Sequence, residues 1–126
     1  MILPARLAAT AVLVAMAGPA LAHHSYSMFD RARTDTVTGT VKSFEMINPH
    51  GWLTVITRDA QGRTREWAVE TGGAGQMGRA GWTADALSEG DKVSVTIHPM
   101  KDGSNSGQLV SALLPNGKTL RGFPGV

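Results

Sequence analysis

Histidine is the residue type in this sequence best suited to chemistry, and its four copies fall at three places. His23 and His24 follow an apolar N-terminal segment, His50 lies in an Asn-Pro-His-Gly corner, and His98 ends an alternating run. Imidazole binds copper, zinc and nickel, and affinity among divalent ions peaks at copper. The first hypothesis is therefore a metal site, with copper as the expected ion and zinc as the alternative.

The role of His23 depends on the segment before it. Residues 1–22 combine a short apolar run, a Gly-Pro break and a final Ala-Leu-Ala motif, which together predict a secretory signal cleaved after Ala22. The mature chain would then begin at His23, whose α-amine and ring can chelate one copper ion together. We expect a periplasmic protein, with full secretion as the alternative.

His50 and His98 are expected at one end of the fold. His50 falls between the first two predicted strands, and His98 precedes the loop between the fourth and fifth. In an OB-fold these two loops flank the same binding face. Three methionines lie near the histidines in the sequence, and their thioethers would favour Cu(I). These are Met28, Met46 and Met100.

Each histidine also has a purely structural interpretation. His23 and His24 can belong to a solvated arm, His50 can serve its turn, and His98 can be an exposed strand-end residue. The sequence contains no tightly spaced ligand motif such as HExxH. The alternative function is therefore an interaction module without metal, which recognises a protein or a carbohydrate through the same end of the fold.

Tryptophan is the second candidate for ligand binding, because aromatic side chains on an OB-fold surface stack bases or sugars. Trp67 shares the apolar alternation of its strand, and Trp82 follows Gly81. We expect both in the core. Trp52, two residues after His50, is the one expected to contact a ligand.

The sequence gives little support for catalysis, and we expect a protein that is not an enzyme. Glu66 and Glu70 share one face of a predicted strand, where paired carboxylates are usually solvated. Ser25 and Ser27 lie near the first histidines, but no acidic partner completes a nucleophilic triad.

Composition excludes several other classes. Twelve Lys and Arg against ten Asp and Glu give a net charge of +2, and loss of Arg6 with the signal leaves +1. We therefore expect no nucleic-acid partner, since such proteins usually carry a concentrated basic surface. With no cysteine there are neither disulfides nor thiolate ligands. No stretch is long and apolar enough to span a membrane once the signal is removed.

The pattern of apolar residues predicts five strands and one short helix. The first predicted strand is rich in Thr and Val. Its apolar residues switch from one face of the strand to the other near residues 42–43, which predicts a β-bulge there. Residues 72–81 hold five glycines, which weakens any helix there, and a helix around Gln76 to Ala80 is kept as an alternative. Thr83 is instead the expected N-cap of a short helix. The strands are expected over residues 36–47, 52–57, 64–70, 92–98 and 108–114, and the helix over residues 83–87.

This order predicts an all-β fold with one short helix, an OB-like five-stranded Greek-key barrel. A small antiparallel β-sandwich is the alternative. We expect a signal peptide over residues 1–22, an N-terminal arm over 23–34, the barrel over 35–114 and a C-terminal tail over 115–126 that pairs briefly.

Several short motifs spread over most of the mature chain give it a family resemblance. It resembles a family of small exported bacterial proteins of unknown function, which implies an exported OB-like domain and no established activity. Residues 72–78 depart from the pattern, being richer in glycine. The motifs are His23-His24-Ser25, Phe29-Asp30, Thr38-Gly39-Thr40-Val41, Asn48-Pro49-His50, Trp67, Gly81-Trp82-Thr83, Gly90-Asp91 and Lys101-Asp102-Gly103-Ser104.

Overall fold

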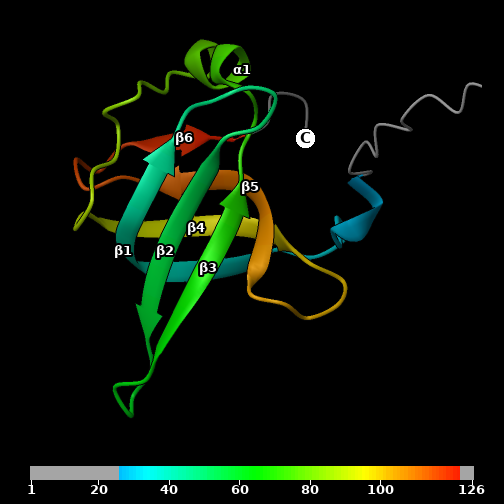
Figure 1. Cartoon of the computed structure of the whole chain (residues 1–126), viewed down its shortest axis with the longest axis vertical. Helices are drawn as coiled ribbons and strands as arrows, with labels where there is room; N and C mark the ends of the chain where they lie inside the picture. The colour runs from blue at the N-terminus through cyan, green and yellow to red at the C-terminus, as the bar shows by residue number, and fades with distance from the viewer. Residues whose placement is uncertain (1–25, 123–126) are drawn as a thin grey trace, which may run out of the picture.

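A single β-sheet that closes on itself forms the body of the protein (Figure 1). The computed structural model describes residues 26–122. In chain order the elements are η1 (Tyr26–Met28), β1 (Asp35–Glu45), β2 (Trp52–Arg58), β3 (Thr64–Glu70), α1 (Ala74–Arg79), β4 (Lys92–Pro99), β5 (Ser106–Leu113) and β6 (Thr119–Arg121).

The strand order confirms the OB-like barrel rather than the sandwich. The sheet runs β3-β2-β1-β4-β5-β6, and a parallel pairing of β3 with β5 closes five strands into a barrel. All the other pairings are antiparallel. The short strand β6 pairs with β5, which confirms the brief pairing predicted for the C-terminal tail.

Strand β1 bends so that it can pair on both sides. Its first half pairs with β4 and its second half with β2, and the register shifts between Val41 and Ser43. This irregularity confirms the predicted bulge. At Gly39 a Cβ atom would meet the carbonyl oxygen of Ile56, so a larger residue would push the two strands apart.

Alternate residues of the strands point inward and form one core, as the period of two requires. Trp82 is buried and donates its indole Nε1–H to the carbonyl of Arg121 at 2.7 Å. Trp67 packs against the core and is partly buried. The buried strand residues are Val37, Val41, Leu53, Val55, Val69, Val93, Val95, Ile97, Leu109 and Ala112.

The helix expected over residues 83–87 is wrong, and the observed helix overlaps the alternative around residues 76–80. Residues 83–87 form turns, and α1 lies instead in the glycine-rich segment before them. Its Met77 is fully buried in the core, and its first backbone N–H, from Ala74, donates to Asn48 Oδ1 at 3.0 Å. These tertiary contacts override the low helix propensity of glycine.

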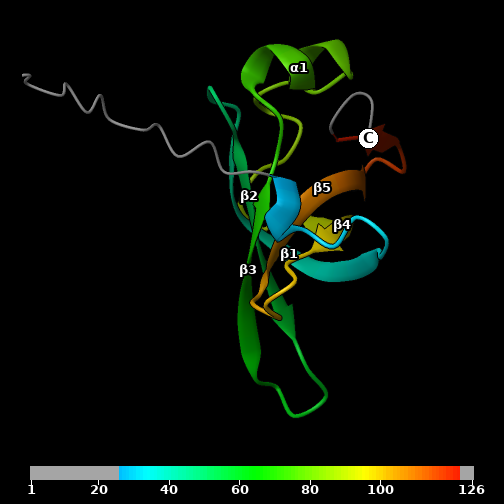
Figure 2. The same ribbon diagram turned by 90° about the vertical axis from the view of Figure 1, so that its right-hand side faces the viewer.

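Two features stand out from the barrel in perpendicular views. Strands β2 and β3 continue beyond it as a ribbon that ends in a hairpin, whereas η1 lies to one side of the barrel (Figure 1 and Figure 2). Within residues 26–122, no helix has the length and apolar character needed to cross a membrane.

Candidate functional site

A cavity of about 370 Å³ lies between the N-terminal arm and the barrel, and we call it the arm pocket. It combines the β1–β2 loop, the β4–β5 loop and the adjoining ends of β2 and β3, which is where OB-folds bind their ligands. Its lining is mostly apolar, with one acidic residue. The lining residues are Met28, Phe29, Pro49, His50, Trp52, Glu70, Met100 and Ser106.

The corner that holds His50 is fixed on both sides by backbone contacts. The Gly51 N–H donates to the Gly72 carbonyl at 3.2 Å, and the Thr71 N–H donates to the Gly51 carbonyl at 2.9 Å. A Cβ atom on Gly51 would meet the Glu45 carbonyl oxygen and the Thr71 hydroxyl. Only glycine therefore lets the corner approach β1 and the end of β3 this closely.

The chemistry of the pocket centres on His50 and Glu70. His50 Nδ1 is buried and lies 3.3 Å from Glu70 Oε1, a distance that makes the two side chains an ion pair when the ring is protonated, although the contact lacks the geometry of a hydrogen bond. Glu70 is only 6% exposed. Its register partner on β2 is Trp52, which is 39% exposed at the edge of the pocket. A carboxylate is thus buried among apolar groups next to one imidazole, a costly arrangement unless its charge is compensated.

A second buried polar residue adjoins Glu70 in the sheet. Gln108 on β5 is in register with Glu70 and is 1% exposed. Within residues 26–122 its Oε1 atom has no hydrogen-bond partner. Two buried polar residues therefore lie next to each other on neighbouring strands, although only Glu70 lines the arm pocket.

The structure separates the histidines that the sequence grouped. His98 is in register with Gln108, so it lies in the same row of the sheet as Glu70, but it does not line the arm pocket. Its Nδ1 is 2.7 Å from the carbonyl oxygen of Arg33. His23 and His24 lie outside the described residues. Across residues 26–122, no three His, Asp or Glu side chains are grouped so that they could hold a metal ion.

A comparison with known protein families identifies the family of this chain. A family model matches residues 10–110, most of its length. The chain belongs to DUF6152, a family of unknown function. No curated protein and no solved structure matches it. The resemblance to a family of unknown function is confirmed in these terms, whereas export and the metal site remain predictions.

In this DUF6152 protein, sequence reasoning found His50 and Trp52 but missed Glu70. The alternation of β3 correctly put Glu70 on the outer face with Glu66, and we expected both to be solvated. That expectation holds for Glu66, which is exposed, and is wrong for Glu70. The arm covers this end of the outer face, and the only sequence signal for it is the apolar pair Met28-Phe29.

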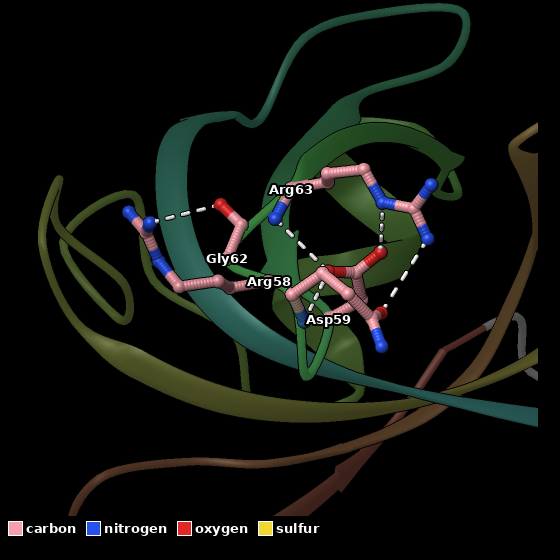
Figure 3. Close-up of polar contacts among 5 residues, drawn as sticks. Arg58, Asp59, Gly62 and Arg63 are labelled. Atoms are coloured by element: carbon pink, nitrogen blue, oxygen red, sulfur yellow. Dashed lines mark hydrogen bonds and ion pairs between the residues drawn. The ribbon is translucent and has the colours of Figure 1, made fainter.

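The opposite end of the β2–β3 ribbon is polar and solvated (Figure 3). Asp59 accepts hydrogen bonds from the backbone N–H groups of Gln61 and Arg63 at 2.9 Å each, and from Arg63 Nε at 2.8 Å. Arg58 donates to the Gly62 carbonyl at 3.1 Å. Desolvation raises the pKa of Asp59, but these hydrogen bonds and the charge of Arg65 together lower it further, leaving it below its ordinary value of 3.8.

Proposed function

We propose that this protein is exported to the periplasm and binds copper in the arm pocket, with zinc as the alternative ion. The observation that carries the proposal is the contact between His50 Nδ1 and Glu70 Oε1 at 3.3 Å. A histidine that binds metal through one ring nitrogen almost always presents the other to a carboxylate, a carbonyl or water. Glu70 supplies that carboxylate, so Nε2 is the nitrogen we assign to the metal.

The negative charge of Glu70 also supports a metal ion at His50. Glu70 is buried against apolar groups, and a buried carboxylate is costly unless a cation or hydrogen bonds compensate it. A metal ion bound to His50 would place positive charge close to this carboxylate. The acid would then both orient the ring and stabilise the bound ion.

The N-terminal histidines are the proposed partners of His50. His23 precedes Met28 by five residues, a stretch that spans at most about 17 Å when extended. Because Met28 lines the pocket, the amine and ring of His23, or the ring of adjacent His24, are within reach of it. His98 is not part of this proposed site.

We propose binding without catalysis. The one hydroxyl group among the side chains that line the pocket belongs to Ser106, and it donates to the Ala68 carbonyl at 2.7 Å. Its proton is therefore directed to the backbone rather than to His50. This arrangement differs from an activated nucleophile, whose proton is directed to a neighbouring base.

The test is a titration with Cu(II) and Zn(II) of protein expressed from the full chain and exported, with its N-terminus determined by mass spectrometry. Two variants are compared: His50→Ala, and an extra Ala inserted between Ala22 and His23. We expect submicromolar copper binding that each change weakens at least about tenfold, a loss of about 1.4 kcal/mol. Absence of binding in the parent would overturn the proposal.

One observation favours the second candidate, an interaction module. Ile47 is 47% exposed and Trp52 39% exposed, and both flank the corner that holds His50. An aromatic anchor beside an apolar side chain is typical of a surface that binds a protein or a carbohydrate. If no metal binds, this module becomes the leading function, with Trp52 as the anchor.

A further inference from the structure

Two methionines are held at the arm pocket by a short backbone pairing. Phe29 and Met100 form an isolated antiparallel bridge. On either side of it, the Asp30 N–H donates to the Pro99 carbonyl at 2.8 Å and the Lys101 N–H donates to the Met28 carbonyl at 3.0 Å. This pairing holds Met28 one position along the chain from Phe29, the register partner of Met100, and both methionines line the pocket together with His50.

The position of the methionines is not explained by the core. The buried core contains Met77, and Met46 packs against it, whereas Met28 and Met100 are only partly buried and lie at the pocket. Thioether sulfur is a neutral, soft donor that selects Cu(I), whereas carboxylate and water ligands suit hard divalent ions. The pocket thus combines two soft donors with one imidazole.

We infer that the arm pocket is a Cu(I) site, in which the thioethers of Met28 and Met100 and Nε2 of His50 bind the ion. This inference rests on the proposed function, and it assigns the two thioethers, in place of the N-terminal histidines, as the partners of His50 when the bound ion is Cu(I). The ion enters as Cu(I) and leaves as Cu(I), so no redox step is involved.

Two other residues of the pocket suit a monovalent soft cation. Trp52 lines the pocket, and a cation over an aromatic face is attracted by the negative charge of the ring face. Glu70 contributes one negative charge, which balances the single positive charge of Cu(I). A neutral apolar ligand of the same size would fill the cavity but would leave this carboxylate facing an apolar surface.

The test compares Cu(I) and Cu(II) in the same exported full-chain protein. Cu(I) affinity is measured under anaerobic conditions by competition with a chromophoric chelator, and Ag(I) serves as a stand-in that does not change oxidation state. The variants are Met28→Leu, Met100→Leu and the double substitution, with Met46→Leu as the matched control outside the pocket. Leucine keeps similar volume and apolar character but removes the sulfur.

We expect each single substitution to weaken Cu(I) and Ag(I) binding at least about tenfold and the double at least about a hundredfold, or about 1.4 and 2.8 kcal/mol. Met46→Leu should leave binding within about twofold, and Cu(II) binding should change little in all variants. In methionine-methyl NMR spectra, Ag(I) should shift the signals of Met28 and Met100 but not that of Met46.

Two results would overturn the inference, and they are distinguishable. If copper binding depends on His50 but the double variant retains Cu(I) affinity and the two methyl signals do not move, the ligand set is wrong and the metal-binding proposal survives. If the parent binds none of Cu(I), Ag(I), Cu(II) and Zn(II), the proposed function fails together with this inference.

Discussion

The β2–β3 ribbon carries a carboxylate near each end, Asp59 in the hairpin and Glu70 at the arm pocket, and the two are stabilised in different ways. Asp59 accepts three hydrogen bonds within its own hairpin, in contact with water. Glu70 is 6% exposed, and its ion-pair partner within residues 26–122 is the ring of His50. The hairpin therefore stabilises its own charge, whereas at the pocket end we propose that a further cation compensates the carboxylate.

The two ends of the ribbon also differ in which parts of the chain form them. The hairpin is local, since all its polar contacts join residues within five positions of one another. The pocket joins the arm, two loops and two strands, so it forms only when the barrel closes. Substitutions at the pocket end should consequently affect both stability and copper affinity, whereas those in the hairpin should affect stability alone.

The largest effect is expected from Gly51→Ala at the corner. The new Cβ would meet the Glu45 carbonyl and the Thr71 hydroxyl, which should lower the free energy of unfolding by about 1–3 kcal/mol. Because the corner positions His50, copper affinity should fall as well. Denaturant unfolding and copper titration of the same variant measure both effects.

The matched control is Gly62→Ala in the hairpin. Gly62 has a positive φ of 78°, and a Cβ atom added there would have no neighbour within 4 Å. Only backbone strain is therefore expected, which should lower the free energy of unfolding by about 1 kcal/mol. Copper affinity should not change. Equal loss of copper binding in both variants would contradict the separation of the two ends.

Glu70→Gln should separate function from stability at the pocket. Loss of the carboxylate that orients a metal-binding histidine typically lowers metal affinity about 10- to 100-fold. The free energy of unfolding without metal should stay within about 1 kcal/mol of the parent, because a neutral amide replaces a buried charge. Copper affinity that survives this substitution would count against the role assigned to Glu70.

The two described histidines should behave differently. His98→Gln should leave copper affinity within about twofold and lower the free energy of unfolding by about 1 kcal/mol, since it loses the contact with Arg33. His50→Gln should abolish submicromolar copper binding. Equal losses of copper affinity in the two variants would instead support the site shared by His50 and His98 that the sequence suggested.

The smallest effect is expected from Asp59→Asn in the hairpin. The depressed pKa of Asp59 means that the carboxylate stabilises the fold above the ordinary value of 3.8, and that this contribution is lost as the pH falls through the lower folded value. The variant should melt only a few degrees below the parent at neutral pH. That difference should disappear in acid, as thermal melts at several pH values would show.

Much of the barrel could be predicted from the sequence because its signals are local. Alternation of Val93, Val95 and Ile97 gave β4, and the parity slip in β1 gave the bulge. The helix could not be placed, because burial of Met77 outweighs the propensity of the glycines around it. Thr83, the expected N-cap, instead donates its hydroxyl to Asp85 within a turn.

The candidate site was only partly predictable for a related reason. His50 and Trp52 stand out by residue type beside a recognisable corner. The burial of Glu70 depends on an arm that precedes it by some forty residues and on the bridge between Phe29 and Met100. No period or motif within β3 carries that information.

X-ray absorption spectroscopy at the copper edge, on exported protein loaded anaerobically with Cu(I), would identify the atoms that bind the ion. We predict a first shell of two sulfur atoms and one imidazole nitrogen, with the sulfur contribution lost in the Met28→Leu, Met100→Leu double variant. A shell of nitrogen and oxygen only, or a protein that retains no copper after desalting, would contradict it.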